Sequence, residues 1–282
     1  MFTKLVATCL GALVYCAATA ASAQTPPAQT APAQPAAPAP EEKPVWHGPF
    51  GGTFSAGAAF VTDYSYRGIS QTQRGVAFQP SFTYETAAVT SENLSAWGYA
   101  GAWASNVNFP GTGAFAEVDL IGGVRGKALG DQLTCDIGYI RYNYPGSNGL
   151  LQLDFNELGL VVGYDFGPVQ LSGAVRYSPN FFANSGNAWY KWGQVVVPLP
   201  FIKVNENVSF KLFGTLGNQS VQRFINYGIP NDNYWDWQLG ATATVWGVDL
   251  TLAYVDTNID VTGCGNTQNC AARVIFTVSK TF

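Results

Sequence analysis

Hydrophobic and polar side chains alternate along the chain from residue 50 to residue 282. In the closing segment, 273–282, apolar residues fall on one face and polar residues fall on the other. The apolar face carries Val274, Phe276, Val278 and Phe282. A period of two residues predicts a β-strand with one face against a hydrophobic phase. A strand of this kind that ends the polypeptide on an aromatic residue is typical of an outer-membrane β-barrel.

The same alternation recurs often enough to predict about twelve strands, within the even-numbered range of bacterial outer-membrane barrels. Residues 50–282 are too many for a small all-β sandwich of about 100 residues. We therefore predict an all-β fold: a transmembrane, antiparallel, up-and-down β-barrel. The predicted strands are 53–64, 76–85, 95–106, 115–126, 132–142, 154–164, 169–178, 189–198, 207–216, 234–245, 248–255 and 273–282.

The alternation also predicts which side chains face lipid. In segment 115–126, Val118, Leu120 and Val124 share one face, and acidic and basic residues occupy the other. In segment 95–106 the aromatic residues are expected to point outward and the small residues inward; these aromatics are Trp97, Tyr99 and Trp103. Segment 189–198 is ambiguous in phase.

The connections between the segments alternate in length. Long polar connections are expected at 65–75, 107–114, 143–151, 179–188, 217–233 and 257–271, whereas 165–168 and 246–247 are tight turns. Long loops outside the cell and short turns in the periplasm are the outer-membrane pattern. This pattern places both chain termini in the periplasm.

The N-terminal residues differ from the barrel in composition. Lys4 precedes a short apolar stretch, and Ala21-Ser22-Ala23 fits a cleavage site, so 1–23 is predicted to be a signal peptide. Residues 24–49 are rich in Pro and Ala and are predicted to form a disordered periplasmic spacer. The barrel is expected to occupy 50–282.

Several motifs resemble a known family. Residues 62–71 read TDYSYRGISQ, residues 101–109 read GAWASNVNF, and residues 117–120 read EVDL. The segment 142–146 reads YNYPG. Together these are similar to motifs of the TorF family of porins, also called the Gcw_chp family, with Tyr66 in place of the commoner Phe. The resemblance implies an outer-membrane barrel and a pore, and it brings no catalytic residues.

The residue inventory argues against several other functions. The single histidine, His47, precedes the first predicted strand, so no imidazole is expected on the barrel wall as a general base. We therefore predict that the protein is not an enzyme. Acidic loop residues lack an organised ligand spacing, and no cofactor or metal site is expected. A net charge of −4 argues against nucleic acid as a partner.

We make specific predictions for two features near the C-terminus. Cys264 and Cys270 lie in the last long loop and are expected to form a disulfide in the oxidising periplasm. The C-terminal strand, ending at Phe282, is expected to be the signal that the barrel-assembly machinery recognises. The remaining expected partner is the lipid of the outer membrane.

The lumen is the candidate functional surface. Charged residues of both signs at inward positions could orient small polar solutes in a narrow channel. Arg67 and Arg74 in the first loop, and Phe181 and Phe182 in the fourth, are candidates to fold over the mouth. The residues expected to line the lumen are Glu117, Asp119, Arg125, Asp136, Glu157, Arg176, Lys191, Lys211, Asp236, Asp249 and Arg273.

We therefore predict an outer-membrane porin-like channel for the passive diffusion of small polar solutes or ions. The alternative is a plugged, non-conducting barrel whose extracellular loops bind a ligand or partner. A barrel of about twelve strands falls between small filled barrels and large open ones, so the strand number leaves both possibilities open. Dense ion pairing across the lumen would favour the alternative.

Overall fold

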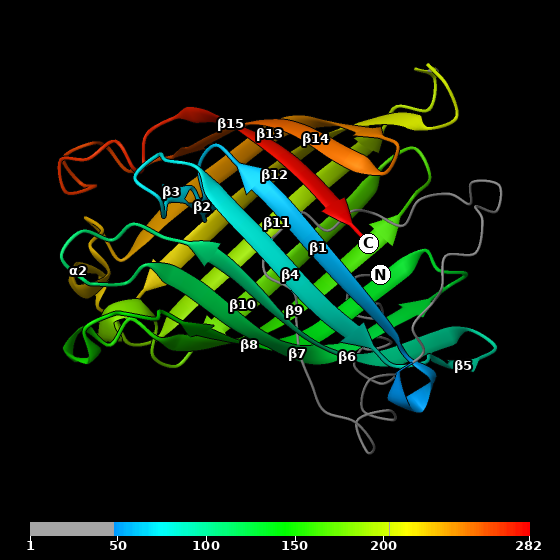
Figure 1. Ribbon diagram of the computed structural model, residues 1–282, viewed down its shortest axis with the longest axis horizontal. Coiled ribbons are helices and arrows are strands. Elements are labelled where there is room, and N and C mark those ends of the chain that lie inside the picture. Colours follow the sequence, from blue (N-terminus) through cyan, green and yellow to red (C-terminus); the bar gives the residue numbers. More distant parts are fainter. Residues whose placement is uncertain (1–47, 203) are drawn as a thin grey trace.

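The computed structural model describes residues 48–202 and 204–282. The predicted signal peptide and nearly all of the predicted spacer lie outside these residues. Among the described residues, no helix is long and apolar enough to cross a membrane. The predicted all-β fold is confirmed, and Figure 1 shows the strands as a tilted, closed barrel.

Twelve long strands form the barrel wall, and every neighbouring pair is antiparallel. The ring closes because β1 pairs with both β15 and β4, and β4 pairs with β6. All of the predicted strands are present, with ends shifted by a few residues. The wall strands are β1 (Thr53–Val61), β4 (Ala77–Glu85), β6 (Leu94–Asn106), β7 (Ala116–Ala128), β8 (Leu133–Asn143), β9 (Phe155–Asp165), β10 (Gln170–Ser178), β11 (Ala188–Pro198), β12 (Val208–Val221), β13 (Asn233–Val245), β14 (Val248–Thr257) and β15 (Arg273–Thr281).

The smaller elements lie in the connections between wall strands, except η1, which precedes β1. The short strand β5 (Val89–Ser91) pairs with β6, and β2 (Ser65–Tyr66) pairs with β3 (Ile69–Ser70) in a separate hairpin. The helix α2 (Phe224–Tyr227) lies in the connection between β12 and β13. Three single turns of 3-10 helix complete the set: η1 (Pro49–Gly51), η2 (Gly149–Leu151) and η3 (Phe182–Asn184).

The two ends of the barrel differ. The long connections, including the β2–β3 hairpin and α2, gather at one end, on the left of Figure 1, which we call the loop end. The tight connections β9–β10 and β13–β14 lie at the opposite end, which we call the turn end. The alternation of loop lengths predicted from the sequence is thus present in the structure.

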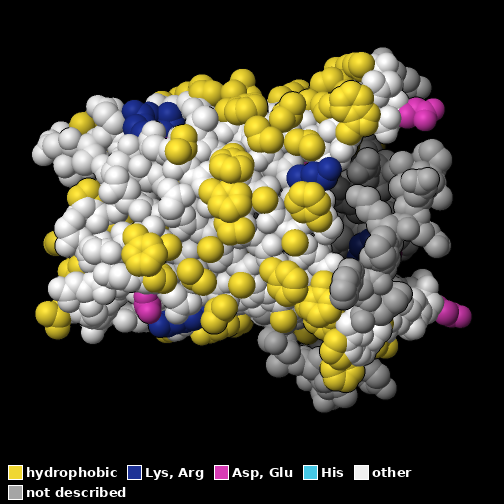
Figure 2. Space-filling view, in the orientation of Figure 1, with side chains coloured by type: hydrophobic (Ala, Val, Ile, Leu, Met, Phe, Trp, Pro, Cys, Tyr) yellow, Lys and Arg dark blue, Asp and Glu magenta, His cyan; other side chains and the backbone are white. Residues whose placement is uncertain are grey.

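The outer surface of the wall is apolar. Phe60, Leu158, Leu216, Leu239 and Leu252 are each more than half exposed. Figure 2 shows hydrophobic side chains spread over the visible side of the barrel, with few charged groups between them. Because water would penalise this much exposed apolar surface, the outer face fits a hydrocarbon environment.

One predicted strand phase is wrong. In β6, Tyr99 and Trp103 are buried and point into the lumen, whereas we expected them to face lipid. Trp103 packs edge-on against Tyr64 at 5.3 Å, and the Tyr99 hydroxyl donates to Asp136 at 2.7 Å. The small residues of β6 therefore face outward, so the aromatic residues fill the interior.

Candidate functional site

The first long connection turns into the barrel instead of extending away from it. Its β2–β3 hairpin carries Arg67 and Gly68 at the tip, both with positive φ (50° and 82°). A Cβ atom at Gly68 would lie 2.3 Å from Thr257 Cγ2 and 2.9 Å from Asp236 Cβ. Only glycine fits at this position, so the tip of the hairpin is lodged against the inner wall formed by β13 and β14.

Arg67 reaches across the lumen to the far wall. Its Nη2 atom donates to both carboxylate oxygens of Glu157, at 2.7 and 2.6 Å, and its Nη1 atom donates to Gln219. The side chains of Arg67 and Glu157 are only 2% and 1% exposed. An ion pair this deeply buried is strongly destabilised if one partner is removed, because the other charge then lacks compensation.

Aromatic rings enclose the same guanidinium group. Its carbon lies 4.2 Å from the ring centre of Tyr190, 4.6 Å from that of Tyr66 and 5.6 Å from that of Phe181. Burial alone would lower the pKa of Arg67, but the Glu157 carboxylate together with Tyr66 and Tyr142 outweighs burial, so the pKa lies above its usual value. Arg67 therefore carries its charge inside a site built from one carboxylate, one amide and aromatic faces.

A second buried ion pair anchors the base of the hairpin. Arg273 on β15 pairs with Asp63, and its Nη1 atom donates to the carbonyl of Gly68 at 2.9 Å. Asp63 also accepts from the hydroxyls of Ser70, at 2.5 Å, and Thr72, at 2.8 Å. One carboxylate thus holds both arms of the hairpin to the barrel wall.

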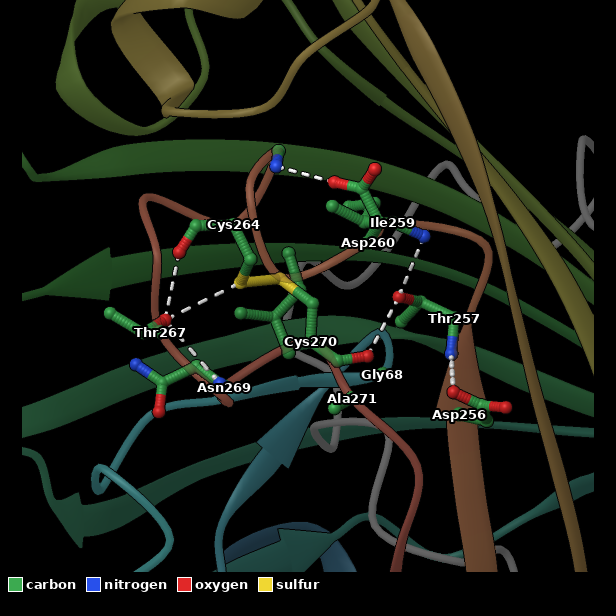
Figure 3. The surroundings of a disulfide bond; sticks show 12 residues. Gly68, Asp256, Thr257, Ile259, Asp260, Cys264, Thr267, Asn269, Cys270 and Ala271 are labelled. Carbon is green, nitrogen blue, oxygen red and sulfur yellow. Dashed lines mark hydrogen bonds between the residues drawn. A yellow bond between two sulfur atoms is a disulfide. The ribbon is translucent and has the colours of Figure 1, made fainter.

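The last long loop covers the hairpin from the outside. Cys264 and Cys270 form a disulfide with their Cα atoms 6.0 Å apart, and Figure 3 shows this closed loop near Gly68. The Ser70 amide donates to the Asn269 carbonyl at 2.9 Å. Arg74, which is exposed, donates to the Ala272 carbonyl at 2.8 Å. The first and last loops are therefore joined over the mouth.

Aromatic packing fills the rest of the loop-end lumen. Tyr142 and Phe155 stack at 4.1 Å, and Phe155 meets Phe181 at 4.6 Å. Phe181 is fully buried, and Phe182 packs against the same cluster. The Tyr64 hydroxyl donates to Glu117 at 2.9 Å. At this level the interior is a packed layer of side chains.

Beside this layer, at the same level of the barrel, the wall presents carboxylates with spare hydrogen-bonding capacity. Glu117 and Asp119 are fully buried on β7. One oxygen of Glu117 and both oxygens of Asp119 have no hydrogen-bond partner among the described residues. Asp236 accepts from the Tyr190 hydroxyl at 3.1 Å, and Arg176 is buried on β10.

The family comparison bears on these residues, because it covers the whole described chain. The profile of the family described as "Bacterial protein of unknown function (Gcw_chp)" matches residues 47–282. The chain belongs to the Gcw_chp family. Every element of the barrel, the inserted hairpin and the disulfide lie within the matched region.

No curated protein matches this Gcw_chp chain. Among solved structures, LpxR from Salmonella typhimurium is similar, with 9% identity, a TM-score of 0.42 and coverage of 81% of this chain and 99% of that one. The COG4313 outer membrane channel from Pseudomonas putida F1 has 9% identity, a TM-score of 0.41 and coverage of 81% and 95%. The translocator domain of the autotransporter NalP from Neisseria meningitidis has 13% identity, a TM-score of 0.43 and coverage of 81% and 88%.

The turn-end half of the Gcw_chp lumen is more polar and more open. Arg125 pairs with Glu85 at 2.5 Å and with Asp136 at 3.0 Å, and all three side chains are partly exposed. Further along the wall, Lys211 is partly exposed, and Asp249 accepts from the Thr244 hydroxyl at 2.5 Å. Charged groups here are within reach of solvent.

The structure places ten of the eleven residues predicted to line the lumen in inward register. Lys191 is the exception: it is exposed and pairs across the sheet with Val175, which is 41% exposed on the outer face. The ambiguous phase of its segment is resolved by Tyr190, whose hydroxyl meets Asp236 inside the barrel. Lys191 therefore belongs to the outer surface.

Sequence reasoning missed three residues of the site. Asp63, Tyr190 and Gln219 contact the hairpin or its arginine, yet none was singled out. For Tyr190 and Gln219, alternation could have indicated the inward face, but nothing in the sequence shows which loop residue they meet. Among the described residues, no group of three or more His, Cys, Asp and Glu side chains is arranged to hold a metal ion.

Proposed function

We propose that the protein is an outer-membrane channel for small polar solutes or ions, and that its first loop closes the conduit in the state described here. The buried ion pair between Arg67 and Glu157 carries this proposal. It joins the hairpin of the first loop to the barrel wall inside the loop-end lumen. Charged residues on the wall at both levels supply a polar path once the hairpin leaves.

Three features support the membrane placement. The wall is closed, so no strand edge meets lipid, and its outer face is apolar. The difference between long loops and short turns supports an orientation with the loop end outside the cell and both termini in the periplasm. The motifs of residues 62–71 and 117–120 support the narrower assignment to TorF-family porins.

The partners follow from this placement. Outer-membrane lipid would surround the apolar outer face of the wall. The barrel-assembly machinery would recognise the C-terminal strand that ends at Phe282. The solutes would be small and polar, because the lumen wall is lined by charged groups and hydroxyls. No nucleic acid, cofactor or metal ion enters the proposal.

The proposal assigns no reaction to the protein. The chain's single histidine, His47, precedes the described residues, so the described wall offers no imidazole base. The buried carboxylates meet arginine and tyrosine groups, an arrangement suited to holding a loop or a polar solute.

A second function is favoured by the packed aromatic layer. Rings from four wall strands and five connections meet at the loop end, including Trp103, Tyr142, Phe155 and Phe181. If this layer is permanent, the barrel does not conduct, and its loops serve to bind a surface ligand or partner. The two functions differ in what happens when the hairpin is released.

Planar-bilayer recording distinguishes them. Refolded protein (residues 24–282) is compared with Arg67→Ala, which removes the link to Glu157, and with Lys191→Ala, which removes a cation from the outer surface of the wall. We expect the wild type and Lys191→Ala to be closed most of the time, and Arg67→Ala to show about tenfold more open time.

Folding is checked beforehand by circular dichroism and by resistance of the barrel to protease. A folded Arg67→Ala variant that stays silent would contradict the channel and support the non-conducting barrel. An open wild type that the substitution leaves unchanged would show that the hairpin does not close the conduit.

A further inference from the structure

We propose that the pocket holding Arg67 is a binding site for the cationic group of a solute, a guanidinium or alkylammonium, and that Arg67 occupies it as a tethered substitute. This inference rests on the proposed function and names the class of solute that the channel takes.

The pocket is made almost entirely by the wall and not by the hairpin. Glu157 comes from β9, Tyr190 from β11 and Gln219 from β12, and Phe181 comes from the loop after β10. Only Tyr66 travels with Arg67. If the hairpin withdraws, four groups that recognise a cation stay behind in the same arrangement.

The chemistry of these groups is selective for a planar or compact cation. A carboxylate that accepts two hydrogen bonds, an amide oxygen and two ring faces together satisfy both the charge and the donors of a guanidinium group. An anion would meet Glu157 and the negative faces of the rings. A neutral solute would leave the buried carboxylate without a counter-charge.

The charge balance of the lumen points the same way. Apart from the Asp63–Arg273 pair at the base of the hairpin, the buried inward groups of this region comprise four carboxylates, Glu117, Asp119, Glu157 and Asp236, and two guanidinium groups, Arg67 and Arg176. Withdrawal of Arg67 leaves the four carboxylates facing one arginine. The carboxylate oxygens of Asp119 have no hydrogen-bond partner among the described residues. They can therefore accept hydrogen bonds from a cationic donor next to the pocket. The open lumen therefore attracts cations.

The first test measures binding without any need for conduction. Methylguanidinium is titrated by calorimetry into detergent-refolded wild type, Arg67→Ala and Arg67→Ala/Glu157→Gln, with methylurea as the neutral analogue of the same shape. A tethered arginine competes at a high local concentration, so we expect Arg67→Ala to bind methylguanidinium about tenfold more tightly than the wild type, or better. The double variant should lose this gain, and methylurea should not bind.

A second measurement covers the case in which Arg67→Ala does not fold. Chymotrypsin cleaves after aromatic residues, and the bond after Tyr66 is protected while the hairpin is inserted, because Tyr66 and Arg67 are 5% and 6% exposed. Methylguanidinium should compete for Glu157 in the wild type and speed this cleavage, and methylurea should not.

The outcomes separate the two proposals. Binding that is equal in the wild type and a folded Arg67→Ala variant, or cleavage that methylguanidinium and methylurea affect alike, would overturn the cation site. Such a result leaves the channel intact if Arg67→Ala conducts. Conversely, tight binding by a variant that never conducts would keep the site and overturn the channel.

Discussion

At the scale of single residues, the most consequential side chain outside the Arg67 pocket is Asp63. It accepts hydrogen bonds from Ser70 and Thr72 and pairs with Arg273, and both members of the pair are buried. The carboxylate therefore couples the folding of the hairpin to the position of β15.

We expect Asp63→Asn to release the hairpin. The substitution leaves the Arg273 charge buried without its partner, a change that typically costs about 3–5 kcal/mol. The rate of chymotrypsin cleavage after Tyr66 should rise, while the barrel itself stays resistant. Asp232→Asn, at an exposed loop position, serves as the control and should leave this rate unchanged.

A double variant refines the interpretation. Asp63→Asn combined with Arg273→Met removes both charges. Chymotrypsin should therefore cleave the double variant after Tyr66 more slowly than it cleaves Asp63→Asn. If the single and double variants behaved alike, the hydrogen bonds to Ser70 and Thr72, and not the ion pair, would hold the hairpin.

At the scale of elements, the disulfide-closed loop after β14 acts as a cover on the hairpin. Its Asn269 carbonyl accepts from the Ser70 amide, and the Cys270 carbonyl accepts from the Thr257 hydroxyl at 2.9 Å. The covalent link keeps these carbonyls in place.

Replacing both cysteines, Cys264→Ser/Cys270→Ser, should loosen this loop and leave the barrel intact. A disulfide that closes so short a loop contributes about 2 kcal/mol to the free energy of unfolding, because it restricts the unfolded chain. Thermolysin should then cut in the segment 258–263 faster than in the oxidised wild type. Wild type treated with dithiothreitol should show the same increase, and protection that survives reduction would indicate that packing alone holds the loop.

The wall strands were predictable because each one obeys a simple rule. One face meets lipid, so apolar residues recur at every second position, as in β7 and β12. The rule identifies strands better than it identifies faces. In β6 both sets of alternate positions are free of charge, and the inward choice depends on Trp103 contacting Tyr64 from the first loop.

The candidate site was predictable only in part, for a related reason. Charges at inward positions can be read from the alternation, and Arg67 stood out in its motif. Its partner could not be read, because Glu157 is 90 residues away in sequence and the contact depends on a loop folding inward. In β11 the mixed pattern did not fix the phase of the strand, and the assignment of Lys191 to the lumen was wrong.

At the scale of the whole molecule, the closed ring separates a lipid-facing surface from a lumen along every strand. The same substitution at adjacent positions on one strand should therefore destabilise the barrel by very different amounts. Leu239 lies near the middle of β13 and is 66% exposed on the outer face, whereas Gln238 faces inward.

We expect Leu239→Arg to lower the free energy of unfolding in lipid vesicles by about 2–4 kcal/mol, the range for arginine near the bilayer midplane. Gln238→Arg should cost much less, because its side chain reaches the polar interior. Unfolding by guanidinium chloride, followed by tryptophan fluorescence, measures both. An equal loss of unfolding free energy in the two variants would argue against lipid around the apolar outer face.

The seam between β1 and β15 has a consequence for how the molecule is made. It joins the first wall strand to the last, with Gly57 opposite Thr281 and Val61 opposite Thr277, so its two halves are the wall strands that lie farthest apart in the sequence. Until the seam closes, β1 and β15 each present an unpaired edge, which in a free chain invites pairing with another molecule. Closing a contact of such long sequence separation is intrinsically slow. The open sheet thus stays vulnerable until these two strands meet, and that one contact removes both edges at once.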